Sequence, residues 1–532
     1  MLTYNYQNFY EMICHNAKND PNKKVLFFEK KSTTNQELKT KVDILATFLH
    51  VKGIKEGHRV GLIIANCEEF IVSFLAATRL GAICVPINTF LKHEEFSHIL
   101  NDCGAKMIIS SPAYQKETSS LLVTTGIEAI LWTEEFEQYD DKNFSYIDIQ
   151  KKAIKSDLSV SPKIDDLVCI IYTSGTTGKP KGAMLSYKNM LSNMVAAKLV
   201  MNITNKDRFI VYLPMFHSFT LTVMILLPIY FESSIVIVRS VFPFSNILKQ
   251  VLLKRVTIFL GVPTVYNALL KAKIPWYFMW FNCIRIFVSG SAPLSEKSIS
   301  DFTAKFKKAK LIEGYGLSEC SPGVAINRMD LQKPLSVGPA LPGYTIKIVD
   351  EEMVELKTGE VGEIIVHGDC TMQGYYKNEL ETEETLVNGW IKTGDLGKLD
   401  EDGYLFIVDR KKDLIISKGI NIYPREIEEV LYQLDIVANA AVIGIKNDIS
   451  DEDVIAFIEY KDDAPKRLNE MQIKKYLKEH LANFKIPKEI YIVDDMPKNA
   501  TGKVLKRVLK EQVLKEIEEA KIKEGFKVEE GV

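Results

Sequence analysis

The regular alternation of short apolar runs with longer amphipathic stretches, from about residue 40 to 300, is the feature that most constrains the fold. Runs such as "RVGLIIAN" (59–66), "LVCIIYT" (167–173) and "IRIFVSG" (284–290) have the length and the β-branched content of buried strands. Stretches such as "EEFIVSFLAATRLG" (68–81) suit helices. Strands that alternate with helices predict an α/β fold with mostly parallel sheets.

The pattern changes twice further along the chain. Between about 335 and 410 short strands follow one another through Gly, Asp and Asn turns, which predicts a small antiparallel, barrel-like unit. After Arg410, helical and strand patterns indicate a separate α+β unit, and the tail from Lys503 is amphipathic at helical spacing. We therefore expect an N-terminal domain over 1–410, with two α/β subdomains and a small β-barrel, and a smaller C-terminal domain over 411–532.

Composition excludes some partners and locations. The net charge of -2 offers no general attraction to nucleic acid, so we expect no nucleic-acid partner. The first twenty residues lack the pattern of a secretory signal, and the apolar segment at 219–231 is too short to span a bilayer, which favours a cytoplasmic location. The aromatic segment "KIPWYFMWFNCIRIF" (273–287) is more typical of half-buried core, but it leaves open a peripheral contact with the inner face of the membrane.

The segment "YTSGTTGKPKG" (172–182) directly follows the apolar run at 167–173. A strand that runs into a glycine-rich loop exposes backbone N–H groups that can converge on phosphate oxygens. It is not a Walker A loop, because only two residues separate its first two glycines and Pro180 follows the lysine. We expect a polyphosphate site that uses the hydroxyls, glycines and amines of Thr173, Ser174, Gly175, Thr176, Thr177, Gly178, Lys179 and Lys181.

This segment resembles the signature of the adenylate-forming enzymes, which include acyl-CoA synthetases, peptide-synthetase adenylation domains and firefly luciferase. Further motifs follow in the order of that superfamily: "PMFHSF" (214–219), "GVPTVY" (261–266), "VSGSAPL" (288–294), "EGYGLSE" (313–319), "GWIKTGD" (389–395), "VDRKKDLIISKGINIYPREIE" (408–428) and "PKNATGK" (497–503). The resemblance implies ATP, Mg²⁺ and coenzyme A as cofactor or co-substrates. It also implies that a carboxylate attacks the α-phosphorus of ATP and that a thiol then displaces AMP.

The resemblance assigns roles around the nucleotide. The loop would hold the β- and γ-phosphates, with Thr176 acting in the first step, and Glu319 would bind Mg²⁺ through a hard oxygen ligand. Tyr315 would lie against adenine, and Ser318 would donate to the α-phosphate. Asp395 would accept the ribose hydroxyls with help from Arg410. The backbone segments expected to surround the nucleotide are Gly290, Ser291 and Ala292, together with Glu313, Gly314 and Gly316.

The resemblance also implies that the C-terminal domain moves. Lys503 would bridge the substrate carboxylate and the α-phosphate during adenylation, and the domain would then rotate about Lys412. After rotation Lys418 and Gly419 would face the active site, where the missing side chain of glycine leaves room for the pantetheine arm. His217 would lie beside the reacting carboxylate and help to open the path of the thiol.

The acid substrate is expected to be apolar. The segments near the acid pocket offer Phe216, Val262, Val288, Gly316 and Cys320 and few charges, which favours an apolar acyl chain over an amino acid. The stretches "NGWIKTGDLG" (388–397), "IVDRKKDLI" (407–415) and "NIYPREIEEVL" (421–431) resemble bacterial long-chain fatty acyl-CoA synthetases, and this resemblance implies a medium- or long-chain fatty acid. The alternatives are a fatty acyl-AMP ligase that loads a carrier protein, a CoA ligase for another apolar or aromatic acid, and, more remotely, a luciferase-like oxygenase. A nucleotide-binding sensor has no need of an adenylation lysine, which argues against that interpretation. The sequence leaves a homodimer open.

Overall fold

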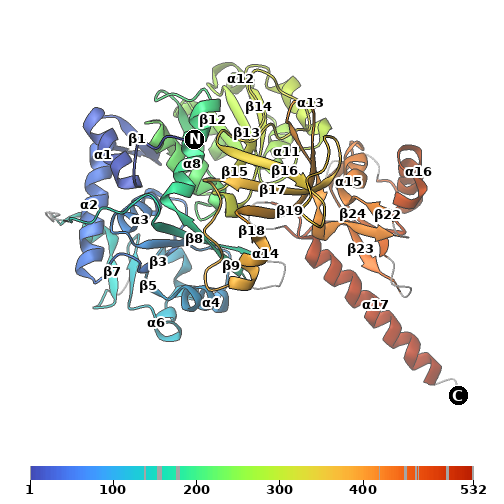
Figure 1. The fold of residues 1–532 in the computed structure, drawn as a ribbon, viewed down its shortest axis with the longest axis horizontal. Helices are drawn as coiled ribbons and strands as arrows, with labels where there is room; N and C mark the ends of the chain where they lie inside the picture. The colour runs from blue at the N-terminus through green and yellow to red at the C-terminus, as the bar shows by residue number, and fades with distance from the viewer. Residues whose placement is uncertain are drawn as a thin grey trace.

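We describe the fold from a computed structural model. It describes residues 2–136, 139–152, 158–174, 180–241, 243–417, 420–447, 452–461, 464, 467–498 and 502–529, with only the backbone for residues 174 and 520–529. The large N-terminal part contains two sheets of mainly parallel strands, and the smaller C-terminal part lies at one side of it, with α17 (Lys506–Glu529) projecting away (Figure 1). The expectation of α/β architecture with mostly parallel sheets is confirmed.

The first sheet of the N-terminal part has seven strands. All neighbours pair in parallel except β8 and β9, which form an antiparallel pair around the glycine-rich loop. In spatial order the strands are β7 (Asn143–Ser145), β6 (Ala129–Trp132), β5 (Ala105–Ser110), β3 (Arg59–Ile63), β4 (Ile83–Pro86), β8 (Leu167–Ser174) and β9 (Pro180–Ser186).

The second sheet has eight strands, parallel except for its two edge pairs β14–β15 and β1–β2. In spatial order they are β15 (Gly323–Ile326), β14 (Lys310–Gly316), β13 (Ile286–Ser289), β12 (Ile258–Gly261), β10 (Arg208–Val211), β11 (Ser234–Ile237), β1 (Lys24–Phe28) and β2 (Lys31–Thr34). Their middle strands are fully buried, which explains why they read as continuous apolar runs.

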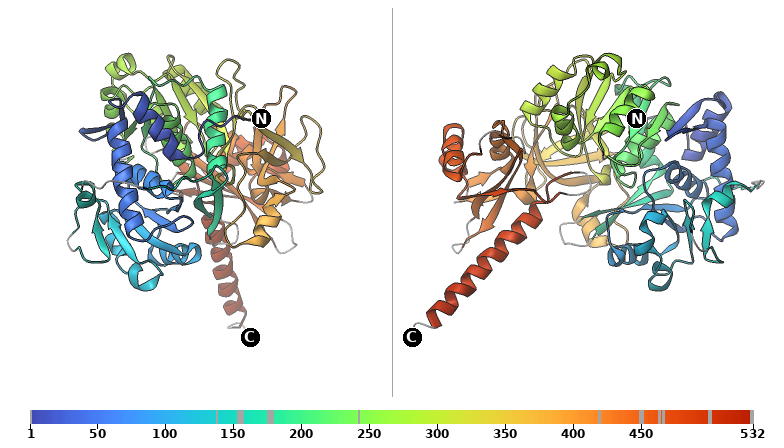
Figure 2. Two further views of the ribbon diagram at one scale, coloured as in Figure 1. Left: turned by 60° about the vertical axis from the view of Figure 1, so that its left-hand side comes forward. Right: turned by 180° about the vertical axis from the view of Figure 1, so that it is seen from behind.

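Helices cover these two sheets, and one extensive apolar core spans them both (Figures 1 and 2). Local signals mark several helix starts: Thr34 and Ser186 each form a capping box at the beginning of α2 and α8. The elements are α1 (Phe9–Asn19), α2 (Asn35–Val51), α3 (Glu68–Arg79), α4 (His93–Cys103), η1 (Pro112–Tyr114), α5 (Gln115–Thr118), α6 (Leu121–Thr124), α7 (Tyr146–Gln150), α8 (Tyr187–Val200), the π-helical η2 (Thr220–Leu226), α9 (Leu227–Tyr230), α10 (Ser245–Leu253), α11 (Pro263–Lys271), α12 (Trp276–Phe281), α13 (Glu296–Lys305) and η3 (Ser318–Cys320).

The segment expected to be barrel-like forms a five-stranded antiparallel half-barrel. Its elements are β16 (Tyr344–Val349), β17 (Gly362–Gly368), α14 (Glu379–Thr385), β18 (Leu386–Val387), β19 (Trp390–Leu399) and β20 (Leu405–Arg410). The register sets Asp395 on β19 opposite Arg410 on β20. Two motifs that are fifteen residues apart therefore meet at one point of the sheet.

The C-terminal part is α+β, as the sequence predicts, and has its own apolar clusters on the two faces of a three-stranded sheet. Its elements are η4 (Lys411–Asp413), β21 (Ile415–Ser417), β22 (Ile420–Ile422), α15 (Pro424–Tyr432), β23 (Val437–Lys446), β24 (Glu452–Tyr460), α16 (Glu470–His480), η5 (Asn483–Lys485), β25 (Glu489–Val493) and α17. The domain boundary at 410/411 and the movement of the C-terminal domain stay predictions.

The structure shows how far the two most apolar segments of the sequence are buried. The segment at 219–231 is almost entirely buried, and none of the helices in the described part of the chain is long and apolar enough to cross a membrane. The segment at 273–287 is half-buried, as the sequence predicts. Phe278 is buried, but α12 leaves Trp276 and Trp280 more than two-thirds exposed.

Candidate active site

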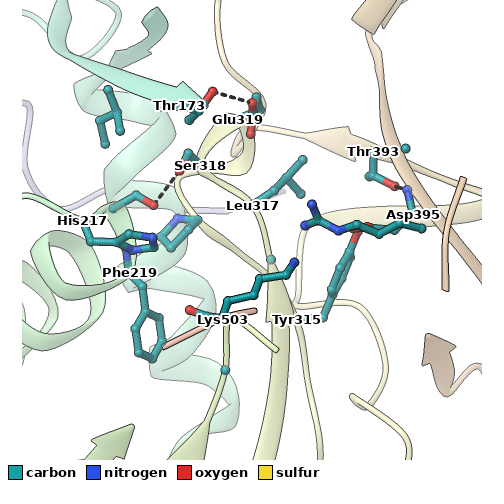
Figure 3. Close-up of a pocket in the computed structure, with 18 of the residues that line it drawn as sticks. Thr173, His217, Phe219, Tyr315, Leu317, Ser318, Glu319, Thr393, Asp395 and Lys503 are labelled. Atoms are coloured by element: carbon teal, nitrogen blue, oxygen red, sulfur yellow. Dashed lines mark hydrogen bonds and ion pairs between the residues drawn. The ribbon is translucent and has the colours of Figure 1, made fainter. Parts of the chain in front are cut away.

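A cavity of about 1790 Å³ lies where the two parallel sheets, the half-barrel and the C-terminal part meet. It exceeds the roughly 300–1,000 Å³ of a site for one small ligand, so it has room for several reactants. The sequence-predicted residues that line it are Thr173, Lys181, His217, Gly290, Ser291, Gly314, Tyr315, Gly316, Ser318, Glu319, Asp395, Arg410, Lys412 and Lys503. Figure 3 shows several of them converging on the same space.

The hairpin β8–β9 forms one wall of the cavity. Thr173 at the end of β8 lies 3.5 Å from a carboxylate oxygen of Glu319, and the hydroxyl of Tyr375 donates to the same oxygen at 2.9 Å. Lys181 forms an ion pair with Glu381 of α14 and lies 5.6 Å from the centre of the Tyr375 ring. The hairpin connection, with Gly175, Thr176, Thr177, Gly178 and Lys179, lies outside the described residues.

Glu319 can be tested as a metal ligand from its surroundings. It lies on η3 at the cavity wall, with the hydroxyls of Thr173 and Tyr375 beside its carboxylate. No cluster of three or more His, Cys, Asp or Glu side chains that could hold a metal is found in the described ranges. Mg²⁺ often uses only one or two protein carboxylates and takes its other ligands from water and substrate phosphates. A lone carboxylate beside hydroxyls therefore fits Mg²⁺ that arrives with ATP.

The carboxylate of Asp395 is held by a partner on each oxygen. The hydroxyl of Tyr315 donates to Oδ2 at 2.7 Å, and Nε of Arg410 lies 3.2 Å from Oδ1. The backbone N–H of Asp395 donates to the Thr393 hydroxyl at 3.1 Å, which fixes the turn before it. Asp395 is 8% exposed. A buried, oriented carboxylate of this kind suits a diol such as ribose.

Lys503 enters the cavity from the C-terminal part, between His217 and Asp395 (Figure 3). Burial and the nearby charge of Arg410 lower the pKa of Lys503 to about 8. Gly502 before it has a positive φ of 80° and lies against α11, where an added Cβ would come within 2.6 Å of the Thr264 hydroxyl. The loop that carries the lysine is therefore docked closely on the N-terminal part.

Glu319, Asp395 and Lys503 line the polar end of the cavity, and the opposite end is apolar. His217 lies between the two ends, and burial lowers its pKa to about 4, so the ring is neutral at pH 7. Beside it the hydroxyl oxygens of Ser218 and Ser318 lie 2.8 Å apart. Beyond His217, α8, η2 and adjacent residues contribute uncharged side chains: Met194, Ala197, Met201, Phe219, Thr222, Val223 and Leu227.

Some predicted residues are not at the cavity wall. Ala292 and Glu313 do not line it, and Glu313 is instead buried near Arg425 of α15, where desolvation raises its pKa to about 7. Of the expected acid-pocket residues, Phe216, Val288 and Gly316 line the cavity, whereas Val262 and Cys320 are buried behind it. Lys418 and Gly419 lie outside the described residues.

Several residues that line the cavity are not among those predicted from the sequence. Thr393 and Ser218 lie inside quoted motifs, so they could have been chosen as polar neighbours of Asp395 and His217. Tyr375 and Glu381 lie outside every motif. An antiparallel bridge between Ala183 and Tyr375, with backbone hydrogen bonds on either side of it, pairs that segment with β9. No pattern in the sequence announces that long-range contact.

Comparison with known proteins identifies the family. The family model described as AMP-binding enzyme matches residues 13–376, and the model for the AMP-binding enzyme C-terminal domain matches residues 426–503. The chain belongs to the AMP-binding enzymes. This confirms the resemblance to the adenylate-forming superfamily. Among relatives of this family, a long-chain-fatty-acid–CoA ligase of Bacillus subtilis (strain 168) is 32% identical over 530 residues, which cover 94% of each chain.

Solved structures of AMP-binding enzymes have the same fold. ATP-bound MatB from Rhodopseudomonas palustris matches with a TM-score of 0.86 and 32% identity, over 95% of this chain and 99% of that one. An anthranilate CoA ligase, AuaEII, in complex with anthranoyl-AMP matches with a TM-score of 0.88 and 27% identity, over 98% and 99% of the two chains. The comparison therefore covers the N- and C-terminal parts together.

Proposed function

We propose that the protein is an AMP-forming acid–CoA ligase that activates a medium- or long-chain fatty acid. The observation that carries the proposal is that the cationic Lys503, the paired Asp395 and an apolar end line one cavity. ATP would lie at the polar end and the acyl chain at the apolar end. Membership of the AMP-binding enzymes and the likeness to an ATP-bound structure support the nucleotide half of this proposal.

In the first step a carboxylate oxygen attacks the α-phosphorus of ATP, and pyrophosphate leaves. Asp395 and Arg410 hold the ribose end, and Ser318 donates to the α-phosphate. Lys503 is charged at pH 7 and lies between His217 and Asp395, where it neutralises charge on both reacting partners. Mg²⁺, when bound, would supply positive charge to the phosphates, and Glu319 would hold it.

In the second step the CoA thiol attacks the acyl carbonyl and AMP leaves. Lys503 must withdraw for this step, since it occupies the cavity between His217 and Asp395, where the thiol has to reach the acyl carbonyl. Lys412 lies in the short η4 segment between the half-barrel and the C-terminal sheets, where few dihedral angles need to change. We infer that rotation there ends the adenylation arrangement and exposes the acyl-adenylate to the thiol.

The apolar end supports a fatty acid over a charged acid. The side chains named above for this end, among them Met194, Val223 and Leu227, carry no charge. An ammonium group or a second carboxylate would therefore be buried there without a partner. The Bacillus subtilis relative, named for long-chain fatty acids, supports the same choice. An aromatic acid is the second candidate because AuaEII, of the same fold, is described with anthranoyl-AMP.

The test is AMP and pyrophosphate formation with ATP and Mg²⁺ across short, medium, long and aromatic acids, each with and without CoA. We expect CoA-dependent AMP release that is fastest with a medium- or long-chain acid. Adenylate that accumulates regardless of CoA would instead favour loading of a carrier protein. Turnover confined to aromatic acids would overturn the fatty-acid assignment, and ATP binding with no turnover would indicate a sensor.

A further inference from the structure

The helix α12 presents an aromatic patch to solvent at the outer edge of the N-terminal part, away from α17 (Figure 1). The patch consists of Trp276, Tyr277, Trp280 and Phe281, which are 71%, 47%, 72% and 69% exposed. Positions one, two, five and six of a helix share one face. Trp and Tyr have an apolar body and a polar tip, and both are enriched where protein meets the boundary between water and lipid.

The patch is held firmly by the residues around it. Phe278 on the opposite face is 2% exposed and packs into the main core, with Met279 partly buried beside it. The Asn282 amide donates to the carbonyl oxygen of Phe278 at 2.8 Å and ends the helix. The Lys308 amine donates to the Trp280 carbonyl oxygen at 3.2 Å. The exposed rings therefore stand on an anchored helix.

The surroundings of the patch are basic. From residue 233 to 295 the sequence contains no Asp or Glu and seven basic residues. Arg239 is paired with Glu134 and Arg285 with Asp207, which leaves Lys249, Lys254, Arg255, Lys271 and Lys273 as the local positive excess. Lys271 and Lys273 are exposed just before α12, and Lys307 and Lys308 are exposed after α13, which itself carries the acidic Glu296 and Asp301. Because the whole chain has a net charge of -2, this positive charge is local. Basic residues near an anionic bilayer are attracted to its surface, and salt weakens that attraction.

The patch is linked to the apolar end of the cavity through Arg285. This residue follows α12, and its guanidinium donates to the Asn202 carbonyl oxygen at 2.5 Å. Asn202 follows Met201, which lines the apolar end. Arg285 therefore joins the segment after α12 to the segment after α8, one residue from the cavity wall.

We propose that the aromatic patch and its basic surroundings bind the surface of an anionic lipid bilayer. The rings enter the interface between headgroups and acyl chains, while the lysines remain at the level of the headgroups. Charge complementarity decides for a bilayer over an uncharged apolar protein groove. This inference goes beyond the proposed function, because binding to lipid requires neither ATP nor a particular acid.

The test is sedimentation of the full-length protein with vesicles of phosphatidylcholine alone or with one quarter phosphatidylglycerol. We expect binding to the anionic vesicles to be about ten-fold tighter and to weaken with salt. The variant with Trp276→Ser and Trp280→Ser should lose about ten-fold in affinity, and the variant with Lys271→Ala and Lys273→Ala should lose the preference for anionic lipid. The control Met471→Ser removes a side chain that is 78% exposed on α16, and it should bind as the wild type does.

Tryptophan fluorescence gives an independent readout. Trp132 is fully buried and Trp390 is only partly exposed, so a blue shift on adding anionic vesicles reports mainly on Trp276 and Trp280. Thermal melts of the variants check that they fold. Wild-type protein that ignores anionic vesicles would overturn the proposal, as would equal loss of binding in Met471→Ser. Self-association that the Trp276→Ser, Trp280→Ser variant abolishes, without lipid binding, would identify the patch as an interface between two copies instead.

Discussion

Lys503 should make adenylation depend on pH in a way that the second step does not. Its pKa falls from 10.5 to about 8 because of burial and the charge of Arg410, partly opposed by Asp395. About nine-tenths of the side chain is then charged at pH 7 and about one-tenth at pH 9. We expect kcat/KM for ATP to fall about ten-fold over that range, since this parameter reports the free enzyme. With saturating ATP the phosphates stabilise the charged form of Lys503. The fall in kcat should therefore occur at a higher pH than the fall in kcat/KM.

The coupling between proton binding and docking of Lys503 shows whether the loss of adenylation at high pH comes from lost charge or from undocking of the loop. The docked lysine binds fewer protons than a solvated one between pH 8 and 10.5, so docking becomes more favourable as pH rises through that window. A loss of adenylation there therefore reflects the lost charge. Lys503→Arg keeps its charge at pH 9 and should give a lower but pH-independent rate over this range.

The assay measures both half-reactions in single turnover: pyrophosphate release from ATP and acid, and thioester formation from supplied acyl-AMP and CoA. Lys503→Ala should slow the first by about 10²–10³-fold, as loss of one oriented donor does, and leave the second within about two-fold. Equal loss of both half-reactions would refute the assignment of Lys503 to adenylation. So would a bend near pH 8 that persists in Lys503→Arg.

Three further changes probe other parts of the cavity. Gly502→Ala should reduce adenylation at least about ten-fold because its Cβ would meet Thr264. The control Gly403→Ala changes a glycine with a similar φ of 77° but with no atom within 4 Å of the added Cβ, so it should leave turnover unchanged. Equal rates of pyrophosphate release in the two variants would count against close docking of the loop that carries Lys503. Asp395→Ala should raise KM for ATP about ten- to hundred-fold by removing charged hydrogen bonds to ribose, and an unchanged ATP dependence would show that the ribose site is elsewhere. Val223→Phe narrows the apolar end, so kcat/KM should fall more for hexadecanoate than for hexanoate, and equal falls would place the acyl chain elsewhere.

Much of this arrangement could be predicted because the informative residues lie in contiguous motifs. Thr173 near the end of β8, the serine and glutamate that follow Tyr315, and the aspartate before the β19–β20 turn all reach the cavity. The apolar runs of the parallel strands are equally local signals, so the fold class follows from them.

The residues that could not be predicted depend on long-range contacts or on the direction in which a side chain points, and a local sequence pattern encodes neither. Tyr375 and Glu381 reach Glu319 and Lys181 only through the packing of the segment before β18 against β9. Glu313 lies two residues from Tyr315 in the same motif, yet the fold turns it toward Arg425. In α12 nearly every residue is apolar, so periodicity could not separate the buried Phe278 from its exposed neighbours.

The most direct test of the central claim is an isotope measurement on the AMP product. Hexadecanoate labelled with ¹⁸O in both carboxylate oxygens is turned over with ATP, Mg²⁺ and CoA. The ¹⁸O content of the AMP and the pyrophosphate is then measured by mass spectrometry. Attack of the carboxylate on the α-phosphorus, followed by thiol attack on the acyl carbon, leaves one ¹⁸O in each AMP and none in pyrophosphate. Label in inorganic phosphate, or AMP formed without label, would contradict the acyl-adenylate route that the docked lysine and the cavity support.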